Sequence, residues 1–166
     1  MNLMVSIRKT GTEAVYKVKV YMINTVCSGS TGHIMTDIYE KVLKEGGECR
    51  IAYGRGTAPS GVNAFKTGGR ADNVFHAVKS RLFDAHGFGS AAATKRLVED
   101  IKNFGPDIIH LHNIHGYYLN IQILFDFLKD YNRPVVWTLH DCWAFTGHCA
   151  YYGNCVEWQN GCISCP

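Results

Sequence analysis

The sequence has no long apolar run, no export signal and no basic stripe. No stretch approaches the about 18–20 consecutive apolar residues that a membrane-spanning helix needs. Residues 1–17 alternate polar and apolar side chains and lack the apolar centre of a signal peptide. Lys and Arg are scattered and the net charge is only +3, so nucleic acid is not an expected partner. These absences favour a protein of the reducing cytoplasm.

The composition that remains is that of an ordinary globular domain. The 166 residues are 46% hydrophobic and 19% charged, which allows one well-packed core without disulfide bonds. In a reducing compartment, the seven cysteines are more typical of metal ligands or buried thiols than of disulfides. We predict one domain at residues 17–147, an extra or poorly ordered leader at 1–16, and a cysteine-rich loop at 148–166.

Strand-like and helix-like patterns alternate along the chain. Predicted strands cover 18–24, 49–53, 62–65, 106–112 and the run after Pro134. Predicted helices cover 34–43, 72–83, 94–104 and 119–131. Alternation with short connections is typical of a parallel sheet with right-handed crossovers. The fold class is therefore α/β, with a Rossmann-like, doubly wound parallel sheet.

The run after Pro134 is apolar at nearly every residue and ends at His140 and Asp141. Such a run predicts a strand buried on both faces, in the middle of the sheet. Loops that follow parallel strands gather at one edge, where polar groups point into a crevice. Three loops should meet there, at residues 28–32, 112–117 and 140–145.

The first loop is rich in small residues, with Gly29 and Gly32 for tight turning and Ser30 or Thr31 as a helix cap. The first N–H groups of the following helix would form an anion site. The pattern is neither Gly-x-Gly-x-x-Gly nor a P-loop. A tight turn with a cap and no ligand explains the loop equally well.

The second and third loops carry histidines. His110 and His112 share one strand face, and with His140 they could bind a metal as in metallohydrolases. The alternative, which we favour, is a buried His110 with His112 and Asn113 bonded to polar ligand groups.

At the third loop, His140 could serve as hydrogen-bond donor, general base or metal ligand. Asp141 could orient His140, act as the acid–base group, or cap a helix. Trp143 and Phe145 offer flat surfaces of the kind that sugars stack on, or belong to the core.

The cysteine-rich loop holds Cys149, Cys155, Cys162 and Cys165. Only the last pair has the tight spacing of a zinc knuckle. Four thiolates with nearby glycines could close a tetrahedral structural zinc site. Reduced thiols or an adventitious disulfide are the alternatives.

Three segments together resemble a known family. They are Asn24-Thr25 with Gly29-Ser-Thr-Gly32, the run Pro106 to Tyr118, and the run Pro134 to Cys149 with its Trp-Thr-Leu-His-Asp-Cys-Trp motif. They resemble the N-terminal half of family 4 retaining glycosyltransferases of bacterial exopolysaccharide synthesis, including colanic-acid-type enzymes. The resemblance covers about residues 17–166.

The resemblance implies a GT-B fold, in which two Rossmann-like domains face each other across a cleft. It implies that residues 29–32 approach the diphosphate of a nucleotide sugar, and that His140, with Asp141, lies beside the donor sugar. It implies that His112, Asn113, His115 and Trp143 line the side of a glycan or lipid-linked acceptor. No catalytic metal is expected. The donor-binding second domain is not in the 166 residues, so we expect no transfer by this chain alone.

Two other functions stay open from the sequence: a metal-dependent hydrolase on His110, His112 and His140, and a non-catalytic binding domain with structural zinc. Peripheral contact with the cytoplasmic membrane through Lys79, Arg81, Phe83 and Phe88 is a further possibility. A solvated helix face explains those four residues equally well.

Overall fold

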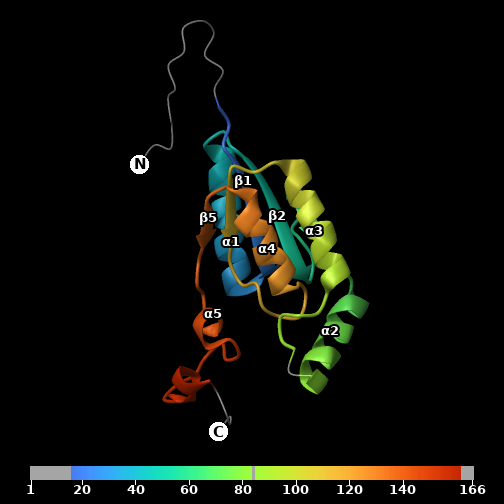
Figure 1. The fold of residues 1–166 in the computed structure, drawn as a ribbon. Coiled ribbons are helices and arrows are strands. Elements are labelled where there is room, and N and C mark those ends of the chain that lie inside the picture. The colour runs from blue at the N-terminus through green and yellow to red at the C-terminus, as the bar shows by residue number, and fades with distance from the viewer. Residues whose placement is uncertain (1–15, 84, 162–166) are drawn as a thin grey trace, which may run out of the picture.

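The computed structural model describes residues 16–83 and 85–161. It contains one parallel five-stranded sheet in the order β3-β2-β1-β4-β5 (Figure 1). The strands are β1 Lys19–Val26, β2 Glu48–Arg55, β3 Ala64–Lys66, β4 Ile108–Leu111 and β5 Val135–Trp137. The helices are α1 Gly29–Lys44, α2 Arg70–Phe83, α3 Ala91–Phe104, α4 Ile121–Tyr131 and α5 Trp143–Thr146, followed by the 3-10 turn η1 Glu157–Asn160. The predicted α/β fold class is confirmed.

The sheet separates two apolar clusters, and β1 contributes to both. Tyr21 and Ile23 join the cluster under α3 and α4, which includes Leu97 and Leu124. Val20 and Met22 point to the other face and pack with Met35 of α1 and its neighbours. Because alternate residues of a strand point to opposite faces, a central strand must be apolar on both.

A charged group anchors α3 to the sheet. Arg50 of β2 donates two hydrogen bonds to Asp100 of α3, at 2.7 and 2.8 Å. The Tyr21 hydroxyl donates to the same carboxylate at 2.6 Å. Burial, together with this bond, raises the pKa of Tyr21 well above its usual value.

The strand after Pro134 lies at an edge of the sheet, so its predicted central position was wrong. β5 pairs with β4, and Val135 and Val136 are 42% and 47% exposed. An apolar run indicates that its residues favour a strand, but it does not indicate whether that strand pairs with one neighbouring strand or with two. The pairing partner is decided by the whole sheet.

The start of α1 also differs from the prediction. The helix begins at Gly29, and Ser28 occupies the cap position without a side-chain hydrogen bond, so Ser30 and Thr31 lie in the first turn and do not cap it. Gly29 has a φ of +72°, which glycine adopts at little cost. A Cβ at Gly32 would lie 2.5 Å from the Cys27 carbonyl carbon, so the helix approaches that backbone too closely for any side chain.

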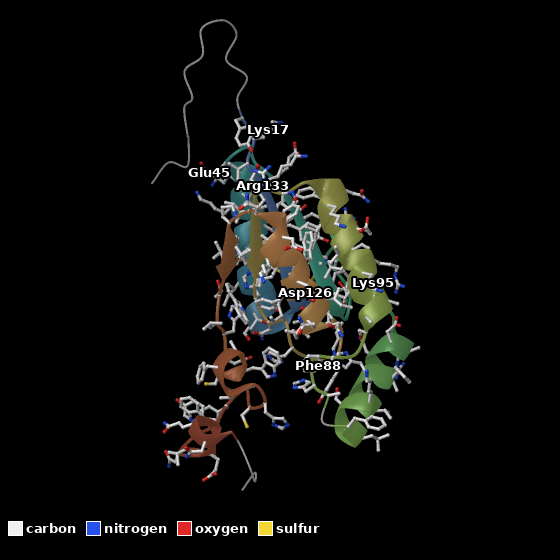
Figure 2. The ribbon with its side chains drawn as sticks, viewed as in Figure 1. Lys17, Glu45, Phe88, Lys95, Asp126 and Arg133 are labelled. Atoms are coloured by element: carbon white, nitrogen blue, oxygen red, sulfur yellow. The ribbon has the colours of Figure 1, made fainter. Side chains whose placement is uncertain are left out.

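No described helix has both the length and the apolar character needed to cross a membrane. Side chains of the outer helices point away from the sheet, as Lys95 of α3 does in Figure 2.

Candidate functional site

Asn24, at the carboxyl end of β1, ties the first two loops together. Its side chain is fully buried. The Oδ1 atom accepts from the backbone N–H of Thr25 at 2.9 Å and of Asn113 at 3.2 Å. The Nδ2 group donates to the Val26 carbonyl at 3.0 Å and to Thr31 Oγ1 at 3.4 Å. Asn24 therefore fixes the position of the loop after β4 relative to the first turn of α1.

Thr25 adds a second connection to the same loop. Its hydroxyl lies 3.0 Å from the Asn113 carbonyl and 2.7 Å from the His115 carbonyl, both of which can accept from it. A Cβ on Gly116 would lie 3.0 Å from the Thr25 methyl group, so the contact is close. Sequence reasoning assigned no site role to Asn24 or Thr25. The signal was two polar residues at the end of an otherwise apolar strand.

A pair of histidines joins the second loop to the third. His112 Nδ1 and His140 Nε2 are 2.8 Å apart, and the two rings are stacked with centroids 5.1 Å apart. His110 stacks on the other side of His112, at 4.3 Å, and bonds Thr138 Oγ1 at 2.8 Å. His110 is only partly buried, whereas His112 is 1% exposed.

The His112 ring is neutral at ordinary pH. Burial, with smaller contributions from the neighbouring His110 and His140, lowers the pKa of His112 to about 3. Burial also lowers the pKa of His110. Among the described residues, His112 Nε2 has no hydrogen-bond partner.

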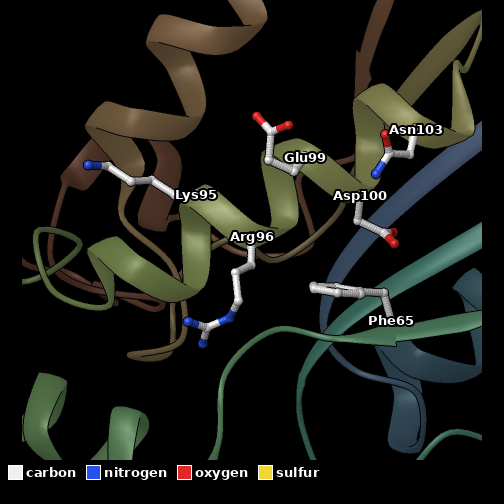
Figure 3. Close-up of a pocket in the computed structure, with 6 residues that line it drawn as sticks. All are labelled: Phe65, Lys95, Arg96, Glu99, Asp100 and Asn103. Carbon is white, nitrogen blue, oxygen red and sulfur yellow. The ribbon is translucent and has the colours of Figure 1, made fainter.

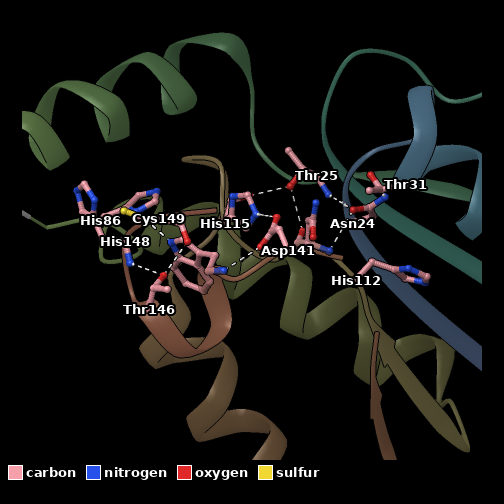
Figure 4. Close-up of polar contacts among 12 residues, drawn as sticks. Asn24, Thr25, Thr31, His86, His112, His115, Asp141, Thr146, His148 and Cys149 are labelled. Carbon is pink, nitrogen blue, oxygen red and sulfur yellow. Dashed lines mark hydrogen bonds and ion pairs between the residues drawn. The ribbon is translucent and has the colours of Figure 1, made fainter. Parts of the chain in front are cut away.

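Asp141 pairs with His115, as Figure 4 shows. Its Oδ2 lies 2.7 Å from His115 Nε2, and its Oδ1 accepts from the Trp143 backbone N–H at 3.0 Å. The N-cap of α5 is Cys142 and not Asp141, but the Asp141 carboxylate holds both His115 and the backbone N–H of the first residue of α5. The His115 ring lies against Trp143, with centroids 5.3 Å apart.

These contacts bring most of the predicted site residues to one edge of the sheet. A small pocket there is lined by His112, Asn113, Ile114, His115, Trp137, Leu139, His140, Asp141, Trp143 and Ala144. Trp143 is buried, and its indole N–H donates to His86 Nδ1 at 3.2 Å. Residues 29–32 do not line this pocket, but Asn24 links Thr31 to it.

A more open groove lies elsewhere, between β3 and α3 (Figure 3). Phe65, Arg96 and Asp100 are among its lining residues, and none of the predicted site residues is. The Asp100 carboxylate is already bonded to Arg50 and Tyr21. The groove is therefore unrelated to the edge where the loops converge.

The predicted zinc ligands fall only partly within the described residues. Cys149 and Cys155 are described, and Cys162 and Cys165 lie outside the described residues. Within 16–83 and 85–161, no group of three or more His, Cys, Asp or Glu side chains is placed to hold a metal ion. His110 instead bonds Thr138, and His112 bonds His140.

Comparison with known proteins shows the family of the chain. The profile of Glycosyltransferase Family 4 matches residues 34–158. The chain belongs to this family. It is also 28% identical, over 153 residues, to WcaC of Escherichia coli (strain K12), a glycosyl transferase named for colanic acid biosynthesis.

That alignment covers 85% of this chain and 37% of the relative, so the chain spans about two fifths of the relative's length. No solved structure matches. The predicted resemblance to family 4 and to colanic-acid-type enzymes is confirmed.

Proposed function

We propose that this chain forms the acceptor-side domain of a retaining GT-B glycosyltransferase. The enzyme would move a sugar from a nucleotide-sugar donor to a glycan or lipid-linked acceptor. The observation that carries the proposal is the convergence of the loops after β1, β4 and β5, with His112 hydrogen-bonded to His140 at their meeting point. Ligands of open α/β sheets bind at this edge.

The first turn of α1 is suited to the donor diphosphate. Gly29, Ser30, Thr31 and Gly32 are its first four residues, and the first N–H groups of a helix have no acceptor within it. The helix dipole adds partial positive charge at the same end. Because Ser28 does not cap these groups with its side chain, they can bind phosphate oxygens.

His112 acts as a positioning residue for His140 in this proposal. Two neutral rings 2.8 Å apart need one donor and one acceptor nitrogen. If His140 donated, the proton of His112 would sit on Nε2, a buried atom without an acceptor in the described chain. Because buried N–H groups without an acceptor are rarer in proteins than buried acceptors without a donor, we assign His112 Nδ1–H as the donor.

This assignment sets the chemistry of His140. Its Nε2 is held as the acceptor, so the neutral ring carries its proton on Nδ1. That N–H would bond a hydroxyl of the donor sugar and hold the sugar while its bond to phosphate breaks. The dipole of that N–H would also stabilise the negative charge that develops on the leaving diphosphate.

His115 and Asp141 would serve the acceptor side. The carboxylate of Asp141 keeps His115 oriented, and Trp143 lies against the His115 ring. Asn113 lies in the same pocket. An acceptor hydroxyl that bonds His115 would thus approach the donor sugar from the loop after β4.

The test uses the enzyme in which this chain is joined to a donor-binding domain. His140→Ala should lower kcat by about 100-fold or more, because a charge-stabilising contact in the transition state is lost. Gln122→Ala, an exposed side chain of similar size on α4, serves as the control. Transfer and nucleotide-sugar affinity both unchanged in His140→Ala would overturn the assignment.

The 166-residue chain alone should transfer no sugar, since the donor would have only one wall of its cleft. Incubation with nucleotide sugars and acceptor, followed by chromatography of the products, checks this. Steady turnover by the isolated chain would show that no second domain is required.

The structural zinc also stays a proposal, with no catalytic role. Elemental analysis of the purified chain should find about one zinc per chain, as a closed four-thiolate site holds. Cys155→Ser should lose the metal, and the buried Cys27→Ser should keep it. Absence of zinc from the unsubstituted chain would argue for reduced thiols.

A further inference from the structure

Helix α2 buries polar residues and exposes apolar ones. Its fully and nearly buried side chains are His76 and Ser80. Its large apolar side chains are 50% to 73% exposed: Val74, Phe75, Val78, Leu82 and Phe83. Water-exposed faces of a helix are ordinarily polar, so this inverted pattern marks a surface that contacts something apolar.

The exposed residues form one continuous stripe. Val74, Val78 and Leu82 are spaced four residues apart and so lie along one face of the helix, with Phe75 beside them. Phe88 is also 52% exposed, in the segment that follows the helix (Figure 2). Its backbone carbonyl accepts from Lys79 Nζ of α2 at 3.4 Å.

Basic residues border the stripe on both sides. At 3.6 residues per turn, Arg70 and Arg81 lie along one edge and Lys79 lies along the other. Asp72 is the acidic residue of Arg70–Phe83, and its carboxylate accepts from the Gly69 backbone N–H at 2.7 Å. Asp84 is next in the sequence and lies outside the described residues. An apolar stripe between cations fits an anionic lipid surface, where apolar side chains enter the interface and cations meet headgroups.

The helix lies beside the candidate site. The His76 ring contacts Tyr117 at a centroid distance of 5.7 Å, and Tyr117 follows His115 in the second loop. His86, after α2, contacts Tyr117 at 4.9 Å and accepts from the Trp143 indole. Figure 1 shows α2 and α5 at the same end of the molecule.

We propose that α2 binds the surface of an anionic bilayer through Val74, Phe75, Val78 and Leu82, with Arg70, Lys79 and Arg81 on the headgroups. This contact holds the sheet edge that carries His140 near the membrane. A lipid-linked acceptor would then reach the site without leaving the bilayer. That last point rests on the proposed function, whereas the lipid contact itself does not.

Vesicle co-sedimentation of the full chain tests the contact. Binding should be strong to vesicles of phosphatidylcholine with added phosphatidylglycerol, weak to phosphatidylcholine alone, and reduced by salt. Leu82→Asp should lower the partition coefficient by about tenfold or more, since it places a charge in the apolar layer. Leu43→Asp, on an exposed apolar position of α1, should bind as the unsubstituted chain does.

A charge reversal tests the electrostatic part separately. Loss of one cation should weaken binding about fivefold, and Arg81→Glu should weaken it by more because it also adds a negative charge. Lys44→Glu, on α1, should leave binding unchanged. Circular dichroism confirms that each variant is folded. His140→Ala should keep full vesicle binding, so failure of the glycosyl-transfer proposal and failure of this one are distinguishable.

Two results would overturn the proposal. One is an unsubstituted chain that ignores anionic vesicles at low salt. The other is a dimer in sedimentation velocity without lipid that Leu82→Asp dissociates, because the stripe would then be covered by a second copy.

Discussion

Two histidines, His76 and His112, are almost completely buried and serve different ends. Both of the His76 nitrogens are bonded to the scaffold: Nδ1 to Ser90 Oγ at 2.9 Å, and Nε2 accepting from the Gly89 backbone N–H at 3.0 Å. A Cβ on Gly89 would lie 2.3 Å from the His76 ring. His112 has one bonded nitrogen, and its partner is the half-buried His140.

Under the proposed function, this difference separates the structural role of His76 from the positioning role of His112. His76 clamps the segment between α2 and α3, and no ligand could reach it. His112 directly follows β4 and holds the His140 ring in place at the edge of the sheet, where a ligand could bind. Burial alone therefore does not distinguish the two residues, whereas the exposure of the bonded partner does.

The largest expected effect is on kcat, which should fall when His112 is replaced but not when His76 is. In the enzyme with a donor-binding domain, His112→Ala should lower kcat about 10- to 100-fold, because loss of an orienting partner typically costs this much. His76→Ala should leave the kcat of the folded fraction within about twofold. Steady-state kinetics measures kcat for both variants. Equal decreases in kcat would contradict the different roles assigned to the two histidines.

Stability should separate them in the opposite sense. His76→Ala should lower the free energy of unfolding by about 3 kcal/mol, because it leaves a cavity and two unpaired groups, Ser90 Oγ and the Gly89 N–H. His112→Ala should cost less, about 1–2 kcal/mol, since it also removes a buried nitrogen without a partner. Urea unfolding at neutral pH measures both values, and a greater loss for His112→Ala would contradict the structural assignment of His76.

The smallest effect is on the pH dependence of stability. Burial, with the nearby His86 and Lys79, lowers the pKa of His76 from 6.5 to about 4 in the folded chain. Between these values the unfolded chain binds a proton that the folded chain does not, so stability falls as the pH falls through this window. In His76→Gln, the free energy of unfolding measured in urea should depend less on pH between these two values, by the equivalent of up to one bound proton. A pH dependence equal to that of the unsubstituted chain would show that His76 does not set it.

Much of the fold was predictable because it depends on local patterns. The period of apolar residues located the strands and helices, although α1 began earlier than expected because its first turn has no apolar residue. Because all strands of a parallel sheet point the same way, the loops after β1, β4 and β5 were expected on one edge. The polar residues at those positions were therefore candidates before any contact was known.

The pairings within the site were not predictable in the same way. Asp141 is adjacent to His140 in sequence but bonds His115, because the turn before α5 aims its carboxylate at the loop after β4. His112, predicted to line the acceptor side, is among the residues that line the pocket, but its Nδ1 is bonded to His140. Asn24 is polar and buried, because its side chain bonds the backbone at the end of β1 and in the loop after β4 and also the Thr31 hydroxyl of α1.

The sequence by itself determined the order of strands and helices, the edge at which the loops gather, and the family to which the motifs belong. Each of these depends on residues close together in the chain. The tertiary structure decided that β5 lies at an edge, that His112 supports His140, and that α2 turns its apolar face outward. These features depend on contacts between segments that are distant in the chain. The strands and helices compete for places in the core, and the apolar faces that find no place there stay exposed.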